Sequence, residues 1–237
     1  MLSIPMTLGC EYNLTAAARA TVWTTVQTAP CSAVRVPALP FWNCAVKIYT
    51  KTGDTGETGL LGAARVSKAD LRIDCLGNVD ELNAGVGYLR TQTAQLSGKQ
   101  LQPELDLLLP IQKRLFELGA AVADVRREVT RLDLGPATRQ LEESIDQQTS
   151  WLPPLTSFIL PAGTPHAALA HLSRAVCRRA ERSLVGLIGE QSPENNSLAL
   201  ENLRIAQIYL NRLSDWLFVL ARGLNHVQGC ADEPWPG

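Results

Sequence analysis

The chain has 237 residues, of which 46% are hydrophobic and 19% charged, and its formal net charge is −1. This length and balance are typical of one ordinary globular domain, alone or with a tail. The near-neutral charge argues against a nucleic-acid-binding surface or a polybasic membrane patch. No apolar run approaches the ~18–20 residues that span a bilayer, so no membrane partner is expected.

The cysteines and histidines show no pattern of a disulfide framework or a metal site. No CxxC occurs, and His166 and His171 lie five residues apart, too far round a helix to share a face. No metal bound by protein side chains is therefore expected, and the natural location is a reducing compartment, the cytoplasm. The six cysteines are Cys10, Cys31, Cys44, Cys75, Cys177 and Cys230.

Residues 1–45 differ from the rest, with only three charged residues and many Thr, Ala and Pro. No helical or strand period persists here. Three interpretations remain: a disordered extension, a segment upstream of a true start at Val46, or a transit peptide, which would change the expected location to the mitochondrion. The first two are preferred because two arginines are few for a transit peptide.

Residues 46–62, VKIYTKTGDTGETGLLG, begin with a short extended stretch and continue as a Gly/Thr-rich loop. Glycines recur at every third position from Gly53, separated by threonines and Lys51. Such a loop can point successive backbone N–H groups inward as a nest for anionic oxygens, and Asp54 can orient a donor or receive a metal-bound water. It lacks the GxxxxGK[ST] pattern of a P-loop, and an ordinary loop is the alternative.

Three helices are predicted next, over residues 73–95, 103–128 and 136–150, after a connector at 64–69 that offers Lys68 as a further anion contact. Asp80 lies in the first helix among small and apolar residues. It can pair with an arginine elsewhere, or it is simply an acid favoured near a helix start.

A proline-rich loop over residues 151–163 carries Phe158, either displayed into a pocket or inserted into the core. The helix predicted over residues 164–189 follows, with Thr164 as its cap and a proline in its first turn. Its apolar stripe leaves two arginines one turn apart, Arg174 and Arg178. Two planar guanidiniums suit a polyphosphate, whereas a solvated face with Arg–Glu pairs is the plainer interpretation.

Glu181, on the same helix, can orient one of these arginines or hold a ribose or a metal-bound water. The last helix, predicted over residues 198–227, places Asn211 and Ser214 about one turn apart on an apolar background. Buried polar groups need partners, so both are expected to bond a neighbouring helix or a ligand. Residues 231–237 are expected to form a polar tail.

Helices with short connectors and almost no strand pattern predict an all-α protein, a helical bundle. The Gly/Thr-rich loop and Lys51 would converge with Arg174 and Arg178 on a nucleoside triphosphate, with Mg²⁺ bridging its phosphates. Without a Ser/His or Cys/His nucleophile pattern, such a protein is better suited to positioning substrates than to covalent catalysis.

Five segments in this order resemble the ATP:cob(I)alamin adenosyltransferases of the propanediol-utilisation type. They are YTKTGDTGETGLLG, GNVDELNAGVG, FILPAG, SRAVCRRAER and NRLSDWLFVLAR, within residues 46–225. FILPAG departs from the family's FxLPGG at Ala162, a change we expect to be harmless.

The resemblance implies a five-helix bundle over residues 46–230 that assembles as a homotrimer with ATP between subunits. The implied activity is transfer of the 5′-deoxyadenosyl group of ATP to the cobalt of cob(I)alamin or cob(I)yrinic acid a,c-diamide, with release of triphosphate. It also implies an electron-supplying reductase and a cobalamin-dependent mutase as partners. Regulatory nucleotide binding, corrinoid delivery and a purely structural bundle remain the alternatives.

The resemblance also implies a role for each site residue. Phe158 would cover the lower corrin face and displace the axial base, Asp80 would pair with Arg174 at the subunit interface, and Ser214 would contact the corrinoid. Phe158, Asp80 and Arg174 would form the catalytic set, and Asp80, Phe158 and Ser214 would bind the corrinoid. The implied ATP-binding residues are Thr50, Lys51, Gly53, Asp54, Gly56, Lys68, Arg174, Arg178, Glu181 and Asn211.

Overall fold

A computed structural model of the chain describes residues 48–61, 65–96, 99–124, 132–190 and 198–236. The chain divides into two units, Met1–Gly53 and Asp54–Gly237. All helices and strands belong to the second unit, and the first is described only by residues 48–53. The predicted extension, residues 1–45, lies outside the described residues.

The second unit is a five-helix bundle preceded by a small hairpin, so the predicted all-α five-helix bundle is confirmed. Strands β1 and β2 pair antiparallel, Glu57 opposite Ser67 and Thr58 opposite Val66. No helix among the described residues combines the length and apolar character needed to span a bilayer. The elements are β1 Glu57–Thr58, β2 Val66–Ser67, α1 Leu71–Thr93, α2 Gln102–Ala123, α3 Gly135–Trp151, α4 Pro165–Gly189 and α5 Leu198–Val227.

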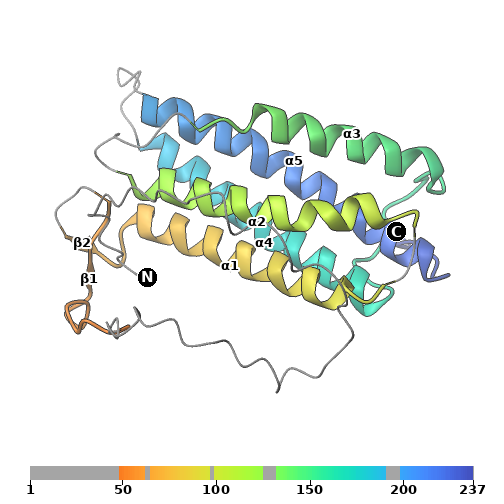
Figure 1. Cartoon of the computed structure of the whole chain (residues 1–237), viewed down its shortest axis with the longest axis horizontal. Coiled ribbons are helices and arrows are strands. Elements are labelled where there is room, and N and C mark those ends of the chain that lie inside the picture. The colour runs from red at the N-terminus through yellow and green to blue at the C-terminus, as the bar shows by residue number, and fades with distance from the viewer. Residues whose placement is uncertain (1–47, 62–64, 97–98, 125–131, 191–197, 237) are drawn as a thin grey trace, which may run out of the picture. The chain divides into compact units, whose positions relative to one another are not determined.

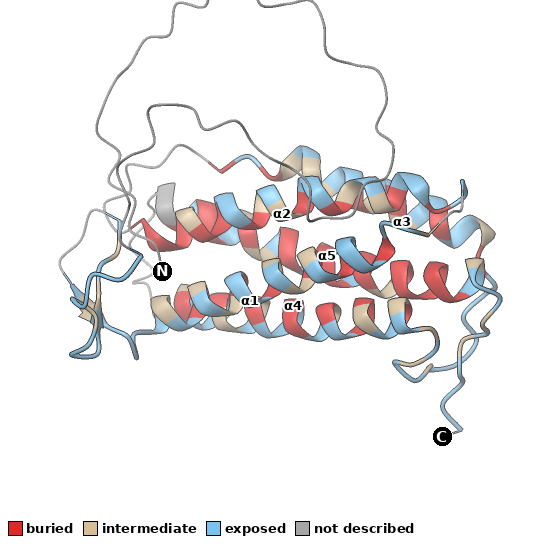
Figure 2. Cartoon of the chain, turned by 60° about the horizontal axis from the view of Figure 1, so that its bottom comes forward, coloured by how far each residue is buried: buried red, intermediate tan, exposed pale blue. Residues whose placement is uncertain are grey.

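Figure 1 shows the five helices lying lengthwise beside one another. Helix α4 packs against both α1 and α5, while α1 also packs against α2 and α5 against α3. The inward faces are buried along most of the bundle (Figure 2). Each helix thus contributes one apolar face to a continuous core, as its spacing of apolar residues requires.

The largest side chains of this core come from α5, where Trp216 and Tyr209 are almost completely buried. The indole Nε1 of Trp216 donates to Ser144 Oγ of α3 at 2.9 Å, and Cys177 Sγ of α4 donates to the Leu210 carbonyl at 3.2 Å. These buried polar groups therefore have partners, which avoids the cost of leaving them unsatisfied.

Among the described residues, the two N-caps that bond through a side chain follow from the local sequence. Asp70 Oδ1 accepts from the backbone N–H of Arg72 at 2.8 Å, and Thr164 Oγ1 accepts from that of Ala167 at 3.2 Å. Short oxygen-bearing side chains satisfy N–H groups that have no partner in the first helical turn. The predicted start of α4 at Thr164 is confirmed.

Two predictions about secondary structure need correction. The second helix was expected to reach residue 128 but ends at Ala123, where Asp124 turns extended. Its last carbonyls bond elsewhere: the Ala123 carbonyl accepts from Leu61 N at 3.2 Å, and the Val122 carbonyl from Arg72 Nη1 at 2.7 Å. The connector expected over residues 64–69 contains β2, because pairing with β1 satisfies its backbone groups.

We predict that Leu213→Ala lowers the free energy of unfolding by about 2–5 kcal/mol, because Leu213 is completely buried in α5 and its loss leaves a cavity. Urea unfolding at a fixed chain concentration measures this. The control is Gln147→Ala, an exposed position in α3 that should change stability by less than about 0.5 kcal/mol. Equal effects of the two substitutions would contradict the assignment of Leu213 to the core.

Candidate active site

Helix α4 displays the two predicted arginines beside each other. Arg178 is exposed, whereas Arg174 is partly buried and its Nε has no hydrogen-bond partner among the described residues of the chain. Burial lowers the pKa of Arg174, and the neighbouring positive charge of Arg178 lowers it further. The two guanidiniums are therefore close enough to repel, which suits a surface that receives a polyanion.

Helix α5 adds Asn211 to the same surface. Its Nδ2 donates to Glu181 Oε1 of α4 at 3.0 Å, and Asn211 is exposed. The structure thus brings together four predicted ATP-binding residues from two helices: Arg174, Arg178, Glu181 and Asn211. The expectation that Asn211 is a buried polar group was wrong, but its expected bond to a neighbouring helix is present.

Ser214 does not behave as expected. It is 3% exposed, and its Oγ donates to the Asn211 carbonyl at 2.9 Å, within its own helix. The expected bond to a neighbouring helix is not seen among the described residues, because a serine hydroxyl in a helix can reach the carbonyl three residues earlier. Its contact with the corrinoid stays a prediction.

Asp80 lies exposed on α1, and no ion pair with Arg174 is present within the described residues of one chain. The α1–α4 contact instead uses Arg179, which the sequence analysis did not single out. Its guanidinium pairs with Glu81, and its Nε donates to Asn78 Oδ1 at 2.9 Å. Arg178 and Arg179 are adjacent in sequence, so they point to different sides of α4. This difference in direction is the sequence signal that could have indicated a separate role for Arg179.

The Gly/Thr-rich loop adopts special backbone geometry on both sides of the division between the units. Lys51 has a φ of 59° and Gly56 a φ of 83°. The first is uncommon for a residue with a Cβ, and such conformations concentrate at functional sites. The Lys51 Nζ lies 6.0 Å from the centre of the Tyr49 ring.

Beyond the division, Asp54 is exposed, and the Gly56 carbonyl accepts from the backbone N–H of Lys68 at 2.8 Å, so Lys68 lies beside the loop. Its contact with an anion stays a prediction. Thr50, Lys51 and Gly53 belong to the first unit. Their convergence with the α4 arginines therefore stays a prediction.

Phe158 is 80% exposed on the loop that precedes α4, so its insertion into the core is wrong, and its display into a pocket stays a prediction. An aromatic side chain exposed to water does not contribute the stabilisation that burial in the core would give. Its exposure makes Phe158 a candidate contact for an apolar face of a ligand.

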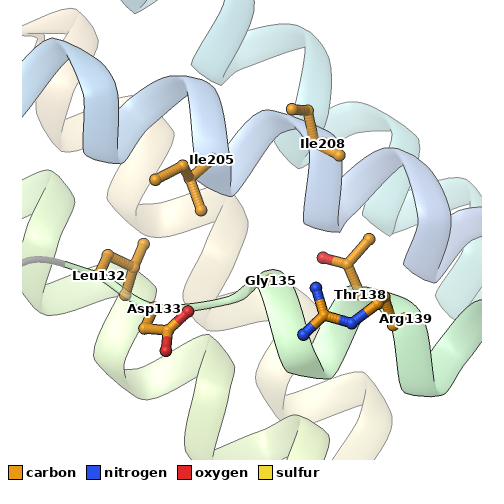
Figure 3. Close-up of a pocket in the computed structure, with 7 residues that line it drawn as sticks. All are labelled: Leu132, Asp133, Gly135, Thr138, Arg139, Ile205 and Ile208. Atoms are coloured by element: carbon orange, nitrogen blue, oxygen red, sulfur yellow. The ribbon is translucent and has the colours of Figure 1, made fainter.

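A pocket of about 600 Å³ lies apart from these residues, between the start of α3 and helix α5 (Figure 3). It contains none of the predicted site residues. Among the described residues, no group of three or more His, Cys, Asp and Glu side chains is placed to hold a metal ion. The pocket is lined by Leu132, Asp133, Gly135, Thr138, Arg139, Ile205 and Ile208.

His171 is a buried residue of α4 that the sequence analysis placed only in a metal argument. It is 3% exposed, and neither ring nitrogen has a partner among the described residues. Its ring lies 5.9 Å from that of Phe218. Burial lowers the pKa of His171 and Arg174 lowers it further, while Asp232 opposes the shift. His171 is therefore held in its neutral form in the folded chain.

Helices α4 and α5 thus carry a cationic and amide-bearing surface, and the loop that precedes α4 displays an aromatic ring. The comparisons with known proteins identify the class. Residues 48–224 match the family model of the cobalamin adenosyltransferases. The chain belongs to this family.

Relatives and solved structures agree. A cobalamin adenosyltransferase of Cupriavidus metallidurans is 42% identical over 198 residues, covering 81% of this chain and 96% of its own. The corrinoid adenosyltransferase of Bacillus subtilis is 40% identical over 188 residues, with 79% and 91% covered.

A variant of the PduO-type ATP:corrinoid adenosyltransferase from Lactobacillus reuteri, complexed with cobalamin and ATP, superimposes with a TM-score of 0.69. It is 35% identical, with 81% of this chain and 97% of that chain covered. The resemblance read from the sequence is confirmed: the chain is an enzyme that transfers the adenosyl group of ATP to a corrinoid.

We predict that the free energy of unfolding falls as the pH falls below about 6.5, the usual pKa of histidine. Below that pH, His171 binds a proton more readily in the unfolded chain than in the folded one, so acid favours unfolding. Above that pH, the contribution of His171 to the free energy of unfolding is constant. Urea unfolding between pH 5 and 7.5 measures the slope. His171→Gln should flatten it. An unchanged slope in His171→Gln would refute the prediction.

Proposed function

We propose that ATP binds over the surface formed by Arg174, Arg178, Glu181 and Asn211. The observation that carries this is the Glu181–Asn211 hydrogen bond, which links α4 to α5 beside two adjacent arginines. The guanidiniums have forked donors for phosphate oxygens, and Glu181 and Asn211 offer an acceptor and an amide for a ribose or base.

The Gly/Thr-rich loop would wrap the triphosphate. Backbone N–H groups at Gly53 and Gly56, with Thr50, Lys51 and Lys68, supply donors and positive charge, and the left-handed backbone at Lys51 and Gly56 supports such a turn. Asp54, which is exposed, would orient a donor or a water bound to Mg²⁺. The Mg²⁺ ion itself would be held by phosphate oxygens, and it would neutralise charge on the leaving triphosphate.

Phe158 would lie against the lower face of the corrin ring. Its side chain has no lone pair to give to cobalt and excludes water and the axial base, so the electron-accepting orbital of Co(II) falls in energy and reduction to Co(I) becomes accessible. Cobalt(I) then provides both electrons of the new bond to C5′ of ATP. The C5′–O bond breaks, and triphosphate leaves with its electron pair. The protein contributes alignment and exclusion of ligands.

The substrate would be cob(I)alamin or cob(I)yrinic acid a,c-diamide, since both present cobalt in a corrin ring. Because the reaction consumes Co(I), a reductase must supply an electron to the Co(II) form. A cobalamin-dependent mutase would be the recipient of the product.

We also propose a homotrimer with its sites between subunits. Asp80 and Arg174 do not pair within one chain, which fits a pair formed between two chains, with Ser214 supporting the corrinoid side. Apolar side chains are exposed on three helices: Tyr88 of α1 is 57% exposed, Phe116 of α2 76% and Leu172 of α4 61%. Contact between chains would remove these surfaces from water.

We predict by sedimentation equilibrium a particle of three times the 25.8-kDa chain mass. The substitution Phe116→Glu should shift the distribution towards smaller species, because a carboxylate is costly to bury without a partner. Gln147→Glu, which adds a charge at an exposed position of α3, outside these three helices, should leave it unchanged. A wild-type mass of one or two chains would exclude the trimer.

We predict that Arg178→Ala weakens ATP binding by about ten- to a hundredfold, the loss expected for charge-assisted hydrogen bonds, with little effect on folding. Calorimetry measures binding. An anaerobic assay with ATP, Mg²⁺ and chemically reduced cobalamin measures product as a light-sensitive alkylcobalamin.

The matched control is Arg139→Ala, an exposed arginine of α3, a helix that carries none of the proposed ATP-binding residues. It should bind ATP as the wild type does. Wild-type binding by Arg178→Ala would refute this ATP site, and ATP binding by the wild type without any product would leave only the nucleotide-binding module.

A further inference from the structure

Residues 230–236, here called the C-terminal strap, pair with the loop that displays Phe158. The Leu160 N–H donates to the Glu233 carbonyl and the Trp235 N–H donates to the Phe158 carbonyl, both at 2.8 Å. Ile159 and Pro234 form an antiparallel bridge between them. The polar tail expected from the sequence thus pairs with this loop through one isolated bridge and two backbone hydrogen bonds.

The strap also supports the Phe158 ring itself. The rings of Phe158 and Trp235 meet edge to face, with centroids 6.5 Å apart and an interplanar angle of 71°. Trp235 is 55% exposed, so this pair lies at the surface and not in the core. Such a contact favours one orientation of an otherwise exposed ring.

One buried ion pair fixes the strap to the bundle. Arg222 Nε of α5 donates to Asp232 Oδ2 at 2.7 Å, with the two side chains only 6% and 18% exposed. The same guanidinium donates through Nη2 to the Pro153 carbonyl at 2.6 Å, where the Phe158 loop begins. Arg222 therefore joins the start of the loop to the strap.

Asn225, one turn further along α5, fixes the other end of the loop. Its Oδ1 accepts from Thr164 N at 2.9 Å, and its Nδ2 donates to the Ala162 carbonyl at 3.3 Å and to Asp232 Oδ1 at 3.4 Å. Gly163 has a φ of 109°, and a Cβ there would lie 2.2 Å from Asn225 Oδ1. Both ends of the loop and the strap thus meet at Asp232 and its two partners.

We propose that Asp232 is a positioning residue for Phe158, acting through Arg222 and the strap. The inference rests on the proposed function of Phe158 at the corrin face. An aromatic ring can keep the axial ligand from cobalt only if it stays at a fixed height and angle, and the loop has no regular secondary structure of its own to hold it there. The strap supplies that support, and Asp232 fixes the strap without touching either substrate.

The first test compares Asp232→Ala with Glu233→Ala, whose exposed side chain leaves the strap's backbone bonds in place. Asp232→Ala should lower kcat about ten- to a hundredfold, the usual cost of a misplaced group, while KM for ATP stays as in the wild type. Electron paramagnetic resonance of Co(II)alamin bound with ATP should show a smaller fraction without an axial ligand. Equal values for the two variants overturn the proposal.

A second pair guards against a folding defect, because Asp232→Ala leaves Arg222 without its carboxylate. Trp235→Pro and Trp235→Ala both lose the indole, but only proline also removes the N–H that bonds the Phe158 carbonyl. Neither touches the buried ion pair. The proline variant should show the smaller fraction of four-coordinate Co(II)alamin, the form without an axial ligand. Identical electron paramagnetic resonance spectra of the two variants overturn the proposal.

Phe158→Ala separates this inference from the function on which it rests. If this variant keeps the wild-type spectrum and kcat, the proposed role of Phe158 fails, and the positioning role fails with it. If Phe158→Ala loses the four-coordinate species while Asp232→Ala and Trp235→Pro keep it, Phe158 acts as proposed and the strap does not position it.

Discussion

Burial of one side of α4 against α1 and α5 is the constraint on which the arrangement of the site depends. Ala170, Cys177, Ala180 and Leu184 are fully buried there, and the helix cannot rotate without exposing them. Because side chains follow each other round a helix at a fixed angle, the same packing presents Arg178 to solvent and Arg174 at the border of the core. The apolar side of the helix thus sets the direction of its charges.

The packing also explains how the charges divide between structure and chemistry. Arg179 pairs with Glu81 and Asn78 and contributes to the α1–α4 contact. Burial lowers the pKa of Arg174, and the nearby charge of Arg178 lowers it further. The Nε of Arg174 has no hydrogen-bond partner among the described residues. Paired arginines hold a fold together only weakly at a surface, whereas unneutralised ones retain their attraction for an anion. The bundle therefore keeps its unpaired charge where a triphosphate is proposed to bind.

The loop before the N-terminal end of α4 holds an apolar ring, Phe158, in contact with water. A bundle offers stiff helices but no stiff loops, so the Phe158 loop is supported at both ends by α5 and along its length by the chain's C-terminal residues. These supports are buried ionic and amide groups that satisfy one another. An enzyme whose proposed chemistry consists of alignment benefits from such preorganisation.

The sequence by itself determined the bundle, the bounds of α5 and the capped start of α4, because apolar spacing and capping residues act locally. It also determined the family, since its five motifs keep their order. Only the tertiary structure decided that α2 ends at Ala123, that Phe158 is displayed and that the tail pairs with its loop. These outcomes depend on bonds between residues far apart in sequence, such as Leu61 with Ala123 and Asp232 with Arg222, and no local pattern records which distant group satisfies a carbonyl or a charge.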